Sequence, residues 1–266
     1  MIELPAEGVD GQVWRLVCLM ANEFKGSWAL IGARMVELHG RAAGREAPRR
    51  SADVDALCEA KAVGSRPRDL VAWLRAYGFE SDGVSPDGIG HRYRLDDVFI
   101  DVLAPDRLGA RASLDVEDGI RTVAVPGGRR ALNHLGFLAA RCGDVVASIP
   151  VPDLGGALVI KSQAVEVDDV PDNQRVDLAF LYSLVDDPRA LGERLTASDA
   201  RVLRRRRELA SAGHSAWRTW RRSRRRPPCL RLPNPLSGAE LTGVEPAEAG
   251  EGVEAESAAA GRSPAT

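Results

Sequence analysis

Apolar residues in the first half of the chain follow two patterns, one typical of helices and the other of strands. Spacings of three and four residues predict a helix at 12–24 with Asp10 as its cap, a second helix opening at Gly32, and a third at 65–77. Short apolar runs and alternation at every second residue predict strands at 28–31, 52–57, 91–95, 98–103 and 122–125. Two of these strands flank Asp96-Asp97, which predicts a hairpin turn.

From Arg129 onward the pattern becomes mostly helical. Apolar spacing predicts helices at 129–141, 154–168, 173–186 and 197–212, interrupted by one short apolar run at 145–149. Thr196 and Asp199 have the spacing of a capping box in front of the last helix. Strands followed by helices predict an α+β fold, a mixed sheet with flanking helices and then a helical C-terminal half. We place a soft boundary near residue 128, between an α/β core (1–128) and a mostly helical part (129–212) that can share one core with it.

Composition narrows the class of protein. Charged residues make up 28% and apolar residues 44% of the 266 residues, which excludes wholesale disorder. No stretch approaches about 18 uninterrupted apolar residues, so we expect no membrane span. Acidic residues precede the first basic one, which is untypical of a signal peptide. The four cysteines form no Cys-x-x-Cys pair, so we expect no zinc knuckle and a reducing, cytoplasmic location.

Charge is strongly segregated near the C-terminus. Residues 201–226 hold eleven arginines and one acid, and residues 227–266 hold six glutamates and two arginines. We expect 227–266 to be a disordered acidic tail, because it offers little that could pack. The Arg-rich segment 213–226, together with the arginines just before it and with Trp217 and Trp220, favours RNA contact through phosphates and stacking. A solvated helix surface followed by a linker explains the same arginines equally well.

Carboxylates mark the candidate chemistry. On a strand, Asp53 and Asp55 point to the same face, and Asp101 lies inside the apolar strand Val-Phe-Ile-Asp-Val-Leu. A buried carboxylate there is costly unless a cation neutralises it. If the two strands are neighbours, the three carboxylates form a cluster of the hard oxygen ligands that suit Mg²⁺ or Mn²⁺. Such a cluster supports displacement at phosphorus, whereas Asp-x-Asp alone is more often a solvated strand edge.

A glycine adds to this pattern. Gly32 closes a buried strand and opens a helix, a place where backbone N–H groups can face a phosphate.

The order of these elements resembles the nucleotidyltransferase superfamily, most closely the AbiEii-like nucleotidyltransferases of bacterial toxin–antitoxin and abortive-infection systems. The matching segments are 28–40, the motif Arg49-x-Ser51-x-Asp53-x-Asp55, 99–103, 158–161 and 177–181. That family typically has a hydrophobic-Gly-Gly/Ser turn, then Arg-x-Thr-x-Asp-x-Asp, then a lone Asp in an apolar strand. The resemblance covers about residues 25–190, and its specificity lies in the combined order of the motifs.

The resemblance implies a nucleotidyltransferase-like sheet and a Mg²⁺- or Mn²⁺-dependent transfer of a nucleoside monophosphate from an NTP to an acceptor. It assigns metal binding to Asp53, Asp55 and Asp101, with Asp101 assisting the attacking hydroxyl. It assigns nucleotide binding to Gly32, Ala33 and Lys161, and to Arg49 and Ser51, which brace the Asp loop. It implies a supporting role for Asp177. The implied partners are an NTP, an acceptor that is an RNA end such as that of tRNA or a protein side chain, and a cognate antitoxin.

Other readings stay open at this point. Ala33 replaces the family's second Gly or Ser, so it offers no hydroxyl and disfavours a positive φ. This departure leaves room for a catalytically idle module that binds RNA or a protein partner. Transfer to an aminoglycoside-type small molecule is a further alternative, which the basic C-terminal segment disfavours. Lys161 read without the resemblance is a structural residue of an apolar helix face.

Overall fold

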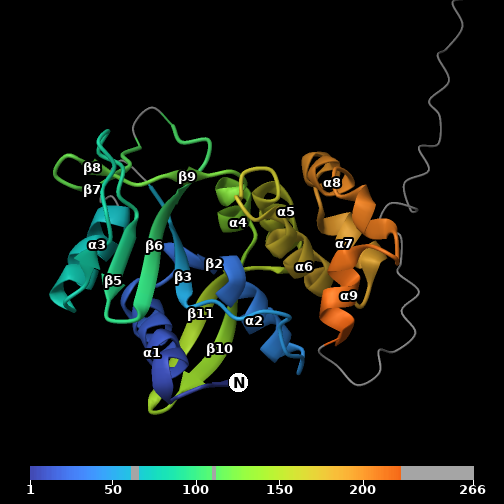
Figure 1. Cartoon of the computed structure of the whole chain (residues 1–266), viewed down its shortest axis with the longest axis horizontal. Helices are drawn as coiled ribbons and strands as arrows, with labels where there is room; N and C mark the ends of the chain where they lie inside the picture. The colour runs from blue at the N-terminus through green and yellow to red at the C-terminus, as the bar shows by residue number, and fades with distance from the viewer. Residues whose placement is uncertain (61–65, 110–111, 223–266) are drawn as a thin grey trace, which may run out of the picture.

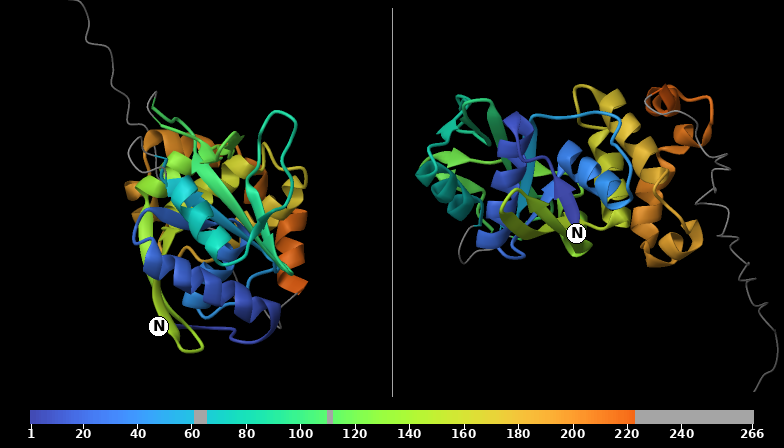
Figure 2. Two further views of the ribbon diagram at one scale, coloured as in Figure 1. Left: turned by 90° about the vertical axis from the view of Figure 1, so that its left-hand side faces the viewer. Right: turned by 90° about the horizontal axis from the view of Figure 1, so that it is seen from below.

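The computed structural model describes residues 1–60, 66–109 and 112–222. The predicted acidic tail 227–266 and the last part of the Arg-rich segment lie outside the described residues. Figure 1 shows strands and α3 at one end of the molecule and helices α5–α9 at the other. The views in Figure 2 agree, with α2 between the two parts.

A mixed sheet forms the centre of the strand-rich part. Its strands follow the order β2-β3-β6-β5-β4, and β9 adds to β6. Their bounds are Trp28–Ile31 (β2), Asp53–Cys58 (β3), Glu80–Ser81 (β4), Arg92–Leu95 (β5), Val98–Pro105 (β6) and Ala124–Val125 (β9). β3 and β6 run parallel, whereas β2 pairs antiparallel with β3, and β5 pairs antiparallel with both β6 and β4. The expected strands at 28–31, 52–57, 91–95 and 98–103 are therefore confirmed within a residue or two.

A second sheet joins the N-terminus to the middle of the chain. β1 (Ile2–Leu4) pairs in parallel with β10 (Leu135–Cys142), which forms an antiparallel hairpin with β11 (Val145–Pro152). The prediction of a helix over 129–141 is therefore wrong beyond α4 (Gly128–Asn133). Apolar residues at 135–142 fit a helix locally, but Gly143, at φ +59°, turns the chain so that pairing with β11 becomes available.

Helices cover both sheets and form the C-terminal part. Their bounds are Gly8–Glu23 (α1), Gly32–Ala42 (α2), Arg66–Ala76 (α3), Leu154–Ala164 (α5), Pro171–Tyr182 (α6), Pro188–Arg194 (α7), Ala197–Arg204 (α8) and Ser215–Arg222 (α9). α1 packs on β10 and β11, and α2 packs on β3 and α6. A two-stranded ribbon, β7 (Asp115–Glu117) with β8 (Ile120–Arg121), lies against α3. The mixed sheet with flanking helices confirms the predicted fold class.

Several expected boundaries differ from the structure, and the helices expected at 154–168 and 173–186 end earlier, at Ala164 and Tyr182. Asp10 does not cap α1 but lies in its first turn, where it forms an ion pair with the buried Arg34 at 2.7 Å. Of the strand expected at 122–125, only β9 at Ala124–Val125 forms, because β8 ends before it at Arg121. The helix expected at 197–212 ends at Arg204 and continues as a short 3₁₀ turn at Arg207–Ala210.

One hydrophobic core extends from the strands to the C-terminal helices. Its largest fully buried side chains include Trp14, Trp28, Phe180 and Trp217. In the described part of the chain, no helix is long and apolar enough to cross a membrane. Burial of these apolar side chains stabilises the fold, and polar pairs set the relative positions of its helices and strands.

Asp199 forms one of these polar pairs, and its contribution to stability can be tested by mutation. It completes a capping box with Thr196, and its carboxylate lies 2.8 Å from Arg130 Nε of α4 while being 1% exposed. Asp199→Asn leaves Arg130 beside a neutral partner, so we expect a loss of about 3–5 kcal/mol in the free energy of unfolding. Thr196→Ala removes one helix cap and is expected to cost about 1 kcal/mol. Chemical denaturation measures both, and equal losses would contradict this reading of Asp199.

Candidate functional site

Three carboxylates gather on one face of the central sheet. In the parallel register of β3 and β6, Asp55 lies directly beside Asp101. Asp53 precedes Asp55 by two residues and therefore shares its face. The intervening Val54 and the neighbouring Ile100 are fully buried on the opposite face. The expectation that the two strands are neighbours is confirmed.

Gly32 brings the start of α2 against this cluster. Its φ is +68°, and a Cβ built on it would lie 1.7 Å from Asp55 Oδ2. The position therefore requires glycine twice, once for the backbone and once for the approach of the carboxylate. Ala33, the next residue, is not among the described non-glycine residues with positive φ. An alanine side chain is therefore compatible with the backbone conformation at this position. Compared with the Gly or Ser of the family pattern, Ala33 lacks only the hydroxyl that a serine would provide.

Arg92 occupies the cluster from the side of β5. Its Nε donates to Asp101 Oδ1 at 2.8 Å and its Nη2 to Asp101 Oδ2 at 2.7 Å, a bidentate pair. The same Nη2 lies 3.3 Å from Asp53 Oδ2. These hydrogen bonds and the nearby carboxylates raise the pKa of Arg92. The cation that a carboxylate inside an apolar strand requires is therefore an arginine of the next strand.

Asp55 carries the least compensated charge of the cluster. Among the residues that the structure describes, its carboxylate takes part in no ion pair. Burial, and secondarily the charge of Asp101, raises the pKa of Asp55 to about 6, against smaller opposing effects of Lys161 and Arg92. Asp55 is thus the point in the cluster where added positive charge is most favourable.

Asp177 connects the helical part to the strand-rich part. It is fully buried and accepts two hydrogen bonds from Arg49, Nε to Oδ1 at 2.9 Å and Nη2 to Oδ2 at 2.6 Å. Lys161 Nζ lies 2.8 Å from the same Oδ2 and donates to Gln174 Oε1 at 2.8 Å. Two cations surround one carboxylate, so this group carries a surplus positive charge, and that of Lys161 acts on Asp55.

Lys161 and Ser51 both have defined polar partners. The Lys161 ammonium is almost completely buried and ion-paired, so it does not snorkel to solvent. Ser51 Oγ accepts a hydrogen bond from the backbone N–H of Asp53 at 3.3 Å, at the start of β3. Ser51 is therefore linked to the carboxylate strand, and Lys161 belongs to the group around Asp177 and acts on Asp55 through its charge.

The donor set suits a divalent cation in kind, because three carboxylates on adjacent strands are hard oxygen ligands. As the described side chains stand, however, no group of three His, Cys, Asp or Glu residues is arranged to hold a metal ion. Arg92 uses both oxygens of Asp101 and one of Asp53. The carboxylates match the implied metal in ligand type, but in the present arrangement a guanidinium occupies their oxygens.

Sequence reasoning missed Arg92, although a signal was present. β5 and β6 are joined by the turn Asp96-Asp97, so pairing Leu95 with Val98 also pairs Arg92 with Asp101. Counting back from the turn would have placed the arginine opposite the buried aspartate.

A cleft of about 760 Å³ lies at the C-terminal end of α2. It is lined by residues of β1, β10, the end of α2 and the 44–50 loop, among them Arg41, Arg45 and Arg50, and it reaches Arg49. The three carboxylates do not line this cleft. It is therefore separate from the cluster on the sheet.

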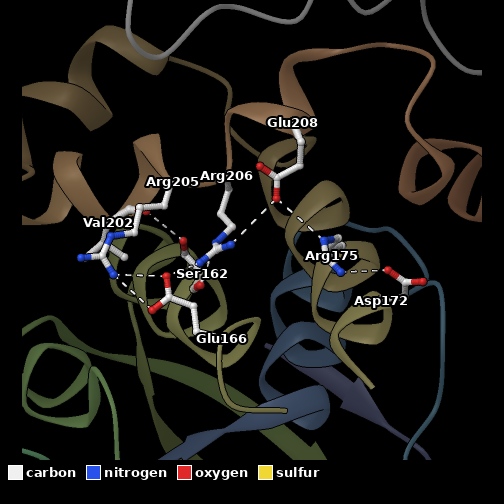
Figure 3. A network of polar contacts seen from close by, with 8 residues as sticks. All are labelled: Ser162, Glu166, Asp172, Arg175, Val202, Arg205, Arg206 and Glu208. Carbon is white, nitrogen blue, oxygen red and sulfur yellow. Dashed lines mark hydrogen bonds and ion pairs between the residues drawn. The ribbon is translucent and has the colours of Figure 1, made fainter. Parts of the chain in front are cut away.

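The arginines before the Arg-rich segment are partly structural. Figure 3 shows Arg205 and Arg206 directed at Glu166 of the turn after α5, and Arg206 Nε also donates to the backbone carbonyl of Ser162 at 3.0 Å. Trp217 is buried, and its Nε1 donates to the carbonyl of Leu209 at 2.9 Å. The expectation that Trp217 stacks on bases is therefore wrong, because the indole belongs to the core.

Comparisons with known proteins give little beyond the site itself. No protein-family model matches the sequence, and no curated protein matches it. One solved structure is similar, an antigenic nucleotidyltransferase-like protein from Paracoccidioides brasiliensis, with 13% sequence identity and a TM-score of 0.44. The match covers 78% of this chain and 92% of that one. At this level of similarity the function has to be argued from the residues of the site.

Gly32 provides a test of how tightly the site is built. Gly32→Ala is expected to cost roughly 3–5 kcal/mol in the free energy of unfolding, from the positive φ and the clash with Asp55. Gly44→Ala is the matched control, because Gly44 has φ +64° with nothing within 4 Å of a built Cβ. We expect it to cost about 1–2 kcal/mol.

In an Asp55→Ala background, Gly32→Ala should cost much less than in the wild type and approach the cost of Gly44→Ala, because the carboxylate is gone and only the Cβ of residue 55, at 3.0 Å, still makes a close contact. Urea denaturation of the double-mutant cycle measures this. An unchanged cost in that background would contradict the packing of Asp55 on Gly32.

Asp55 also provides a test by pH. Its pKa of about 6 in the folded protein lies above the value of about 3.9 for a free aspartate, so the folded state binds the proton more tightly. The stability that this proton provides is full below about pH 4 and is lost as the pH rises through about 6. Relative to the wild type, Asp55→Asn should therefore gain on the order of 1–3 kcal/mol between pH 4 and pH 7.

Denaturation in the presence of a chelator, at both ends of this pH range, measures that gain. Asp97→Asn, in the exposed hairpin turn, is the control and should show no such change. A constant difference between Asp55→Asn and wild type at all pH values would contradict the assignment.

Proposed function

We propose that this protein is a nucleotidyltransferase that moves a nucleoside monophosphate from an NTP to an acceptor hydroxyl. The observation that carries the proposal is the pairing of Asp55 with Asp101 on adjacent parallel strands, with Asp53 on the same face. The start of α2 at Gly32 lies against these carboxylates, so that acidic groups and a helix N-terminus share one place. A triphosphate with its cation needs both kinds of group.

Each residue has a role in this proposal. Asp53, Asp55 and Asp101 hold a divalent cation, Mg²⁺ or Mn²⁺, which when bound offsets the negative charge that develops at the transferred phosphorus. The unpaired N–H groups at the start of α2 face phosphate oxygens. Asp101 receives the proton of the attacking hydroxyl.

The residues around Asp177 support the site from the helical part. Lys161 and Arg49 are held by Asp177, and the charge of Lys161 acts on Asp55, beside which a polyphosphate would lie. Ser51 fixes the backbone at the start of β3, which sets the direction of Asp53 and Asp55. Asp177 is a positioning residue, because it acts through the two cations.

The finer assignment rests on the family resemblance. We propose an AbiEii-like transferase in the cytoplasm with an RNA end, such as the acceptor stem of tRNA, or a protein side chain as acceptor. A toxin role with a cognate antitoxin follows if that acceptor is essential to the cell. Arg204 and Arg201 are exposed on α8 and remain open to a nucleic-acid partner, unlike Arg206.

A second candidate function is a catalytically idle module that binds a nucleotide, RNA or a protein partner. The bidentate pair of Arg92 with Asp101 favours it, since a permanently held guanidinium would leave the carboxylates without a metal. The two candidate functions differ in whether the nucleoside monophosphate is transferred from the NTP to an acceptor.

Purified protein with Mg²⁺, total bacterial RNA and each α-labelled NTP in turn separates them. We expect label on one RNA size class or on a polypeptide with one NTP. Asp53→Asn and Asp55→Asn should each lower this transfer at least about a hundredfold, because a metal ligand is lost. Asp97→Asn should leave it unchanged.

Wild-type protein that binds an NTP but transfers no label would favour the idle module. Transfer that survives both Asp→Asn substitutions would overturn the assignment of the carboxylates.

A further inference from the structure

Arg92 and a divalent cation require the same oxygens. The guanidinium engages both oxygens of Asp101 and approaches one oxygen of Asp53. A carboxylate that accepts a bidentate arginine has its best lone pairs occupied, and a hard cation coordinates through those same lone pairs. Engagement of Arg92 therefore opposes binding of the cation, because it occupies these lone pairs and adds like charge beside them.

The structure gives Arg92 a way to leave. Its side chain is 38% exposed, whereas that of Asp101 is 10% exposed, so the arginine reaches the buried carboxylate from the solvent side. The guanidinium carbon also lies 5.9 Å from the centre of the Phe99 ring, a contact that does not depend on the carboxylates. Rotation of one flexible side chain toward solvent would free Asp101 without movement of either strand.

The net charge of the cluster determines which kind of ligand would take the place of Arg92 beside the carboxylates. Three carboxylates and one guanidinium leave the cluster with a net charge of −2, and Asp55 has no ion pair of its own among the described residues. A divalent cation that displaces Arg92 neutralises the cluster better than the arginine does. The displaced guanidinium loses its anions, and phosphate oxygens of a bound nucleotide are the kind of group that would restore them.

We propose that Arg92 is a built-in competitor of the divalent cation, which it excludes from Asp101 and Asp53 until nucleotide phosphates provide it with a new anionic partner. This inference rests on the proposed function for the nature of the nucleotide, but the competition itself does not require transfer. Its consequence is coupled binding: the cation alone binds weakly, and the cation and nucleotide strengthen one another.

Mn²⁺ binding to the full chain tests the competition, by electron paramagnetic resonance or calorimetry at about pH 7.5 after chelator treatment. Arg92→Gln should tighten Mn²⁺ binding at least about tenfold in the absence of nucleotide. Arg94→Gln is the matched control, because Arg94 is on the same strand two residues away, is 55% exposed and lies near Asp82 rather than the cluster. It should change the affinity less than about twofold.

A gain in Mn²⁺ affinity cannot come from structural damage to the site, because such damage would lower the affinity. Asp101→Asn in the Arg92→Gln background should abolish the gain. If Arg92→Gln is unstable because Asp101 loses its cation, Arg92→Lys carries the test. Lysine keeps the charge but cannot form the bidentate pair, so it should give a smaller gain.

A non-hydrolysable NTP analogue tests the coupling. It should tighten Mn²⁺ binding more in wild type than in Arg92→Gln, where no competitor is left to displace. Arg92→Gln and Arg92→Lys that bind Mn²⁺ no better than wild type would overturn the proposal. A gain in Mn²⁺ affinity without transfer of label would uphold the competition and reject the transferase, whereas transfer without that gain would do the reverse.

Discussion

Three carboxylates lie close together on one face of the central sheet, and the surrounding elements have to compensate their like charge. Parallel pairing of β3 with β6 places Asp55 beside Asp101, and neither strand can shift by one residue without exposing its apolar face. The carboxylates therefore have to be compensated where they stand. Arg92 compensates them from the neighbouring strand, and Lys161 acts on Asp55 from a distance.

The same electrostatic requirement links the two parts of the chain. Asp177 lies on α6 and Arg49 in the segment before β3, and their bidentate pair fixes the helical part against the strand that carries Asp53 and Asp55. Lys161 joins the pair from α5. Substitution of one of these three residues would leave a buried charge uncompensated, so a single substitution in this group is expected to destabilise the fold. A site assembled this way depends on the position of helices more than a hundred residues away in the chain.

Part of the site can be read from the chain because its signals are local. Alternation in β3 puts Asp53 and Asp55 on one face, and a glycine between a buried strand and a helix marks the start of α2. Both depend only on residues close in sequence. Asp101 as an acid inside an apolar strand already implied a cationic neighbour, and the hairpin turn would have identified it as Arg92.

Local patterns were enough to predict the central strands, the common face of Asp53 and Asp55, the capping box of Thr196 and the α+β class. The strand at 135–142 required long-range pairing with β11 and β1, because its apolar residues fit a helix equally well until these strands pair with them. The same holds for Trp217 and Arg206. Whether an arginine or a tryptophan meets solvent, a partner or the core is set by what packs over it, and that information is not local.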